Sequence, residues 1–223
     1  MKKLFYICIL IFFTNCSIEK QIVDKPIVFD EERIALTKEY LKNRYHIDND
    51  SISIRPQIIV LHWTAIPTFK GSYNAFYNSK LPNSRPDIKD ASSLNVSAHF
   101  LVDQDGTIYR LMPEKYMARH VIGLNHCAIG IENVGGTADT PLTKKQLKSN
   151  IKLVTYLTKK YNIEYLIGHY EYTSFENHTL WLENNKAYRT KKTDPGEDFM
   201  NAIRKATKNL NFTPVPLQIQ KTK

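Results

Sequence analysis

The chain has 223 residues, of which 42% are hydrophobic and 11% aromatic. This is enough apolar material for one well-packed domain and leaves little room for a second large one. Thirty-one basic against 22 acidic residues give a net charge of +9, which favours an anionic partner such as a cell-wall polymer, a membrane surface or a nucleic acid. The lysines are scattered along the sequence, however, and no recognised nucleic-acid motif accompanies them, so we expect no nucleic-acid partner.

The first 16 residues predict an export signal. Lys2 and Lys3 precede the apolar run LFYICILIFF, which is short for a membrane-spanning helix and has the length of the central part of a secretory signal. The run ends near Cys16, in a stretch that resembles a bacterial lipoprotein processing site. We therefore expect a lipoprotein that faces the periplasm, at the outer membrane, attached by a lipid on Cys16. An ordinary signal peptide with secretion, or an uncleaved anchor, is the alternative.

Cysteine use agrees with export. Cys8 lies in the signal and Cys16 would carry lipid, so Cys127 alone remains and the mature chain has no intrachain disulfide available. We expect Cys127 to be a small buried hydrophobic residue and not a nucleophile.

The rest of the chain divides into three parts. Residues 17–28 are polar, mixed in charge and without an apolar period, which predicts a tether between anchor and domain. Residues 29–210 form the predicted domain. Residues 211–223 are expected to be a C-terminal tail.

Helices and strands alternate along the predicted domain. Helices are expected over 29–45 with Asp30 as N-cap, from Thr143 where a capping box with Gln146 begins, and after Gly196. Apolar or alternating runs predict strands at 57–63, 97–103, 107–112, 128–134 and 164–169, of which the second and third form a hairpin. The predicted fold class is α/β, a single domain with a central mixed β-sheet flanked by helices.

Four residues stand out as candidates for chemistry. His62 and His169 end two of the predicted strands, Asp194 lies in KKTDPG, and Glu132 lies in IGIENVGG. Two imidazoles and one carboxylate are a ligand set for a hydrolytic zinc site, because they leave a fourth position open for water. A single histidine is more often a hydrogen-bonded structural residue, but the ordered set predicts one zinc ion and an enzyme.

The segments LHWTA, SAHFLV, IGIENVG, IGHYE and KTDPG, in this order, resemble the zinc-dependent N-acetylmuramoyl-L-alanine amidases of the type 2 amidase and peptidoglycan-recognition-protein superfamily. The likeness covers about residues 57–207. It implies a zinc hydrolase that cleaves the amide between N-acetylmuramic acid and L-alanine in peptidoglycan or muropeptides during cell-wall turnover. It also implies roles for individual residues: His62, His169 and Asp194 as zinc ligands, Glu132 as general base and then general acid, and Lys192 as the cation that stabilises the oxyanion. Lys191 is the alternative to Lys192.

The resemblance places further residues along the substrate cleft. They are His99, His120, Asn125 and Trp63. For the two histidines and the asparagine, a structural hydrogen bond is an equal alternative. Trp63 could stack on a sugar or belong to the core.

Two stretches are longer than in compact members of the family. Residues 78–95 are expected to form a loop at the rim of the cleft. The other stretch separates His169 from Asp194, and we expect Trp181 and Leu182 to pack it down. It contains four potential rival ligands, which we interpret as loop residues: Glu171, Glu176, His178 and Glu183.

Two other functions remain open. A non-catalytic peptidoglycan-binding module could share the fold, although such modules usually lack a ligand that is present here. A different zinc peptidase would explain the metal site but not the ordered segments. The expected partners are the peptidoglycan substrate and the membrane, and the chain is expected to be a monomer.

Overall fold

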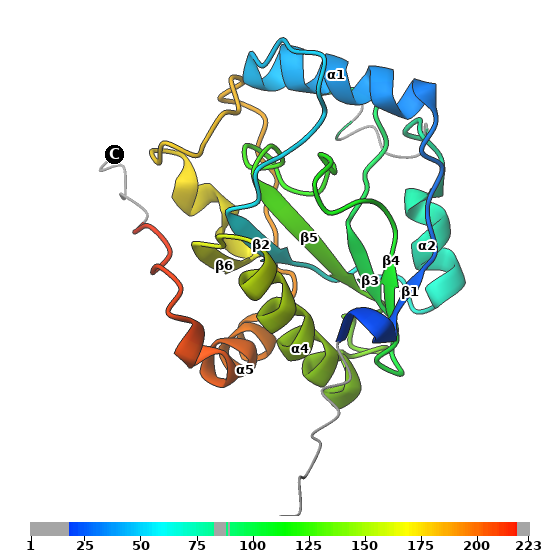
Figure 1. Ribbon diagram of the computed structural model, residues 1–223, viewed down its shortest axis with the longest axis vertical. Helices are drawn as coiled ribbons and strands as arrows, with labels where there is room; N and C mark the ends of the chain where they lie inside the picture. Colours follow the sequence, from blue (N-terminus) through cyan, green and yellow to red (C-terminus); the bar gives the residue numbers. More distant parts are fainter. Residues whose placement is uncertain (1–17, 83–87, 89, 218–223) are drawn as a thin grey trace, which may run out of the picture.

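The computed structural model describes residues 18–82, 88 and 90–217. These residues form a six-stranded mixed sheet in the order β1-β4-β3-β5-β2-β6, with helices packed around it (Figure 1). The predicted class, an α/β domain with a central mixed sheet flanked by helices, is confirmed. The predicted signal, including Cys16, lies outside the described residues.

The centre of the sheet consists of three parallel strands, β2 (Ile58–Leu61), β5 (Ala128–Asn133) and β6 (Tyr165–Gly168). Every residue in them is buried, as expected for parallel strands covered on both faces. β3 (Phe100–Val102) lies parallel to β5, and β4 (Ile108–Arg110) lies antiparallel to β3 as the predicted hairpin.

The predicted helices are present. α1 (Glu31–Tyr45) begins at Asp30, whose side chain accepts a hydrogen bond of 2.9 Å from the backbone of Arg33. α4 (Lys144–Lys160) begins with the predicted capping box, and α5 (Glu197–Ala206) is the expected terminal helix, followed by the short η3 (Lys208–Leu210).

One helix, α2 (Phe69–Tyr77), was not predicted. Thr68 caps it through a 3.2 Å hydrogen bond from Gly71. Gly71 weakens the helical pattern in the sequence, but a Cβ atom at this position would lie only 2.8 Å from the side chain of Ile66. The close approach therefore explains why a glycine stands inside a helix.

The tether expected at residues 17–28 is corrected by the structure. Within the described part of this stretch, η1 (Ile18–Gln21) leads into β1 (Ile22–Asp24), which pairs in parallel with β4. Ile27 beyond it is only 3% exposed. An edge strand of three residues is too short to show a period in the sequence, so the sequence pattern alone indicates a tether.

The expected C-terminal tail also begins differently. In its described part, Phe212 and Val215 pack against the core, and Thr213 donates a 2.8 Å hydrogen bond to the carbonyl of Glu164. Residues 212–215 therefore lie against the domain, whereas Leu217 is 91% exposed.

The register of the central strands decides which side chains share a face. Leu61 pairs with Ile131 and Gly168, and the face that Leu61 and Ile131 share packs on α4 and α5. Because side chains alternate along strands, the next residue of each strand points to the other face. Those residues are His62, Glu132 and His169, so the sheet itself brings three candidate residues together, away from α4.

Among the described residues, no helix is both long and apolar enough to cross a membrane. Cys127 is 3% exposed, and burial raises the pKa of its thiol to about 12. A thiol with so high a pKa is a poor nucleophile at neutral pH, so the prediction of a buried, unreactive cysteine is confirmed.

Candidate active site

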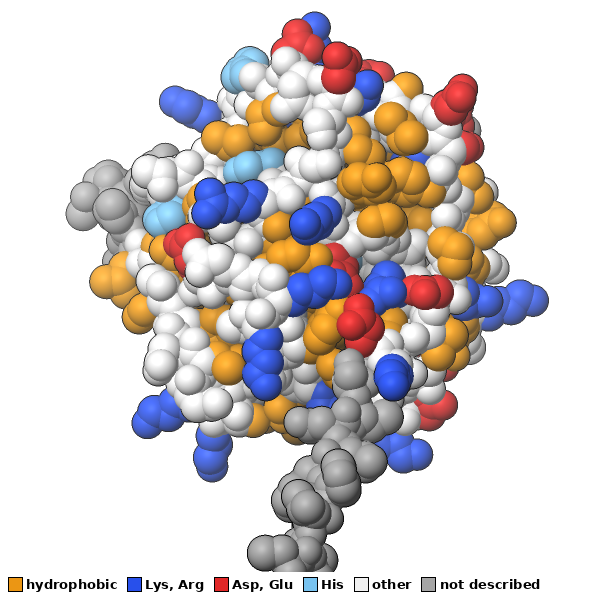
Figure 2. Space-filling model, viewed as in Figure 1, with side chains coloured by type: hydrophobic (Ala, Val, Ile, Leu, Met, Phe, Trp, Pro, Cys, Tyr) orange, Lys and Arg blue, Asp and Glu red, His pale blue; other side chains and the backbone are white. Residues whose placement is uncertain are grey.

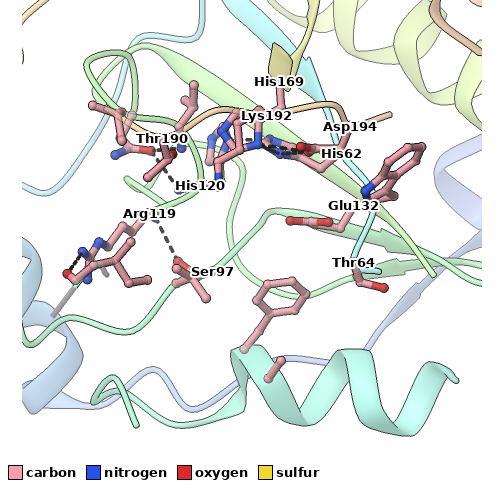
Figure 3. Close-up of a pocket in the computed structure, with 18 of the residues that line it drawn as sticks. His62, Thr64, Ser97, Arg119, His120, Glu132, His169, Thr190, Lys192 and Asp194 are labelled. Carbon is pink, nitrogen blue, oxygen red and sulfur yellow. Dashed lines mark hydrogen bonds and ion pairs between the residues drawn. The ribbon is translucent and has the colours of Figure 1, made fainter. Parts of the chain in front are cut away.

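Three buried side chains converge at the carboxyl ends of the central strands (Figure 3). The Nδ1 atoms of His62 and His169 are 3.0 Å apart, and Oδ2 of Asp194 lies 3.2 Å from the first and 3.0 Å from the second. Tetrahedral coordination with bonds near 2.0 Å separates neighbouring ligand atoms by about 3.3 Å. The three atoms are therefore spaced to bind one metal ion with little rearrangement.

The charges of these groups also suit a cation. Burial lowers the pKa of His169 to about 4, and the positive charge of a protonated His62 acts in the same direction. Burial alone would raise the pKa of Asp194, but its interactions with His169 and His62 outweigh burial, so this pKa lies well below its usual range. A neutral imidazole thus faces an ionised carboxylate, the forms in which both bind metal.

His120 contacts the ring nitrogen of His62 that does not face Asp194 and His169. Its Nδ1 lies 3.0 Å from Nε2 of His62, and its own Nε2 lies 3.3 Å from the carbonyl oxygen of Ala128. Such an arrangement fixes the tautomer and ring orientation of a ligand histidine. Gly130 allows it, since a Cβ atom there would lie 2.7 Å from the His120 ring.

Asp194 reaches the site despite the long gap that precedes it. Tyr170 donates a 3.1 Å hydrogen bond to the carbonyl of Asp194, and the hydroxyl of Tyr172 bonds to both backbone groups of Thr190 at 2.8 Å. Trp181 packs against Gly123, as expected for a segment that is held down. These contacts return the chain to the end of β6.

The four potential rival ligands are engaged elsewhere. Glu171 accepts from Gly168 and Arg204, Glu176 pairs with Arg189, Glu183 pairs with Arg44, and His178 contacts the hydroxyl of Tyr165. Within the described ranges, the group of His62, His169 and Asp194 is the one arranged to hold a metal.

The three ligand candidates lie in the wall of a cavity of 430 Å³. Glu132 projects from β5 beside them and is 8% exposed. Lys192 also lines the cavity, and its charge contributes to lowering the pKa of His169. Lys191 is exposed and is not among the lining residues, which favours Lys192 as the cation next to substrate.

Three of the four residues predicted to contact substrate lie in the cavity wall, and the fourth does not. Trp63, His120 and Asn125 line the cavity. The Asn125 side chain accepts hydrogen bonds from the backbone of His120 and Val121, both at 2.8 Å, so it also holds the loop in place. His99 is fully buried outside the lining.

His99 is bonded at both ring nitrogens. Its Nδ1 accepts from the amide of Gly130 at 3.0 Å, and its Nε2 lies 2.9 Å from the carbonyl oxygen of Tyr116. These contacts leave neither ring nitrogen free to bind substrate. His99 instead joins β5 to the segment around Tyr116 through hydrogen bonds to their backbones. Contact of the other three residues with substrate stays a prediction.

Sequence reasoning missed Arg119, which lies at the end of the cavity away from Glu132 (Figure 3). It is 3% exposed, and its guanidinium donates to the carbonyls of Ile88, Ser92 and Leu94. It thereby fixes part of the predicted rim loop, residues 78–95, to the cavity wall. The available signal was a basic residue next to His120 within an otherwise apolar run.

An α/β domain with two imidazoles, a carboxylate and a second acid in one cavity defines a hydrolase-type site that can bind a metal ion. Residues 52–197 match the family model of N-acetylmuramoyl-L-alanine amidases. The chain therefore belongs to the N-acetylmuramoyl-L-alanine amidase family.

Individual relatives agree with this assignment. The endolysin of Escherichia phage T7 is 31% identical over 106 residues, covering 43% of this chain and 70% of that protein. The endolysin of Enterobacteria phage T3 is 30% identical over the same length and shares. In fold, the chain is similar to peptidoglycan recognition protein-LE, solved in complex with tracheal cytotoxin, with a TM-score of 0.50 and 16% identity over 91% of this chain and 99% of that one.

The family defines the reaction. The chain is an enzyme that hydrolyses the amide bond between N-acetylmuramic acid and L-alanine in peptidoglycan or muropeptides. The activity expected from the sequence is confirmed.

Proposed function

We propose that this amidase is zinc-dependent and holds one ion through His62, His169 and Asp194. The observation that carries the proposal is the spacing of the three ligand atoms, 3.0 to 3.2 Å from one another. Nitrogen ligands with one carboxylate are typical of catalytic zinc sites that keep a position open. When bound, zinc would supply Lewis-acid chemistry, lowering the pKa of a water molecule and polarising the amide carbonyl.

Glu132 is the proposed proton carrier. It lies in the cavity wall beside His62, at the same level of the sheet. Its carboxylate takes a proton from the attacking water and returns it to the nitrogen of L-alanine as the amide breaks. The muramyl carboxylate and the free amine of the stem peptide are the products.

Lys192 is the proposed oxyanion partner. Its ammonium group belongs to the same cavity and acts electrostatically on His169, which places its charge close to the ligand group. A cation in this position stabilises the negative charge that develops on the carbonyl oxygen as water adds. His120 keeps His62 in the orientation that the site needs.

We further propose that the mature protein is exported and anchored by a lipid on Cys16, as a monomer at the periplasmic side of the outer membrane. Support comes from the basic residues and apolar run that precede Cys16. This placement would bring the enzyme next to peptidoglycan. A Cys16→Ser substitution should release the protein from the membrane fraction while leaving hydrolysis unchanged.

The alternative of a non-catalytic binding module has no support from the site, because the ligand candidates and Glu132 share one cavity. Metal content tests the proposal directly. His169→Ala and Asp194→Ala should each lower bound zinc to background after dialysis. His178→Ala is the matched control, since this histidine lies in the stretch between His169 and Asp194 but bonds to Tyr165. Full zinc occupancy in both ligand variants would contradict the assignment.

A further inference from the structure

Helix α4 has an unusual charge distribution. Its sequence, KKQLKSNIKLVTYLTKK, contains lysine at positions 144, 145, 148, 152, 159 and 160 and has no acidic residue. All these lysines are exposed. Lysines are scattered through the sequence as a whole, but these six lie together on one helix.

The helix geometry brings five of them onto one stripe. At 3.6 residues per turn, Lys144, Lys145, Lys148, Lys152 and Lys159 fall within an arc of about 100°. The buried residues Leu153, Val154 and Leu157 lie on the opposite side of the helix. Figure 2, drawn from the viewpoint of Figure 1, shows lysine and arginine side chains on the surface that includes α4.

These five lysines form no ion pair with any described residue, although the charge of Lys145 contributes to lowering the pKa of Asp105. In the part of the chain that the structure describes, Lys160 pairs with Glu114 and Glu19, whereas no carboxylate is within ion-pair distance of the five. Like charges four residues apart destabilise a helix, and lysines 144, 148 and 152 have this spacing. The stripe therefore weakens α4 unless an anionic surface covers it.

The start of the described chain lies against the same helix. In Figure 1, η1 (dark blue) lies beside α4. The hydroxyl of Tyr156 donates a 3.0 Å hydrogen bond to Glu19 of η1, and Lys152 donates one of 3.3 Å to Gln21 of η1. Cys16 stands two positions before η1 begins at Ile18. A chain anchored at Cys16 would therefore be held close to the lysine stripe.

The catalytic side chains point the other way. His62, Glu132 and His169 project from the face of the sheet opposite to the one that packs on α4. With α4 against a membrane, the cavity would face away from the bilayer.

We propose that the lysine stripe of α4 is a docking surface for anionic lipid headgroups, which orients the anchored enzyme with its cavity toward the cell wall. The proposal extends the anchoring proposed above and rests on it for the direction in vivo. The docking itself requires neither hydrolysis nor a lipid on Cys16. Ammonium groups on flexible stems suit the phosphates of a fluid surface, and each lysine near such a surface adds about fivefold to partitioning.

The test compares two sets of vesicles, one of phosphatidylcholine alone and one with about one-third phosphatidylglycerol. The full chain carries Lys145→Gln, Lys148→Gln, Lys152→Gln and Lys159→Gln together. Glutamine keeps helix propensity. The matched control carries Lys38→Gln, Lys42→Gln, Lys70→Gln and Lys186→Gln, which change the net charge equally on other elements. Retained muropeptide hydrolysis shows that both variants are folded.

We expect the α4 variant to lose at least about tenfold in partitioning onto the anionic vesicles, with no change on neutral ones. The control variant should change by less than about twofold, and about 0.5 M salt should remove the anionic preference of the wild type. Equal losses in the two variants, or an anionic preference that survives in the α4 variant, would overturn the proposal. So would stripe-dependent binding to isolated peptidoglycan without any binding to vesicles.

Discussion

Nε2 of His62 lies 3.0 Å from Nδ1 of His120, while Nδ1 of His62 faces Asp194 at 3.2 Å. One ring therefore joins the ligand group to a chain of hydrogen bonds that ends at the backbone of β5. The geometry fixes which nitrogen of His62 is available to a metal ion.

The first prediction concerns this supporting contact. His120→Ala should weaken zinc affinity by about 10- to 100-fold, because the orientation of His62 is no longer held. Zinc titration against a competing chelator measures the change. His46→Asn is the control, since His46 is an exposed residue with a left-handed backbone that asparagine tolerates. Unchanged affinity in His120→Ala would mean that the contact is not needed to hold the ligand.

The second prediction separates metal binding from proton transfer. Glu132→Gln preserves size and removes the basic oxygen, so hydrolysis should fall by about 10²- to 10⁴-fold. Zinc content should stay at one ion per chain, measured by atomic spectrometry on the sample used for kinetics. If the variant loses its zinc, Glu132 is a ligand and its proposed role is wrong.

The third prediction concerns stability at low pH. Burial lowers the pKa of both His99 and His126 to about 4, whereas an unfolded histidine titrates near 6.5. Between pH 4 and 6.5 the unfolded chain binds more protons than the folded chain. The free energy that the two neutral histidines contribute to stability is therefore complete above about pH 6.5 and is lost as the pH falls toward 4. The loss should reach about 1 kcal/mol per pH unit for each histidine.

Urea denaturation at several pH values checks this dependence. His126→Leu should reduce the slope of unfolding free energy against pH by the share of one histidine. His46→Asn, at an exposed position, serves as the control for the removal of a histidine. A wild-type stability that is flat from pH 7 to 4.5 would contradict the prediction.

The fourth prediction concerns a buried cation that joins two helices. Arg33 on α1 is 1% exposed and donates to the carbonyls of Phe76, Tyr77 and Asn78 at the end of α2. Arg33→Ala leaves these carbonyls without their donor, and the free energy of unfolding should fall by about 3 kcal/mol or more. Thermal or urea unfolding measures it, and the exposed Arg55→Ala should shift stability by less than about 0.5 kcal/mol.

The central part of the fold could be predicted from the sequence because its strands are continuous apolar runs. The runs that end in His62 and His169 define both the sheet and the ends that carry the candidate ligands. β1 could not be predicted, since three residues at a sheet edge show no period. α2 was hidden by Gly71, whose presence depends on the close approach of Ile66.

Side-chain surroundings were harder to predict than strand ends. Arg119 lines the cavity because three carbonyls from a distant segment converge on it, and no local pattern announces such a contact. His99 follows the family motif, yet the fold turns both its ring nitrogens toward backbone groups. The lysine stripe follows from the helical spacing of residues 144–159, but the sequence does not show that this stripe lies beside η1 and opposite to the catalytic side chains.

The most direct test of the zinc amidase assignment is mass spectrometry of a defined muropeptide after digestion by the purified protein. The products should be a free stem peptide that begins with L-alanine and a muramic acid with a free lactyl carboxylate. A chelator should abolish both, and added zinc should restore them. Cleavage within the stem peptide would indicate a peptidase, and an intact muropeptide after prolonged incubation with stoichiometric zinc would contradict the central claim.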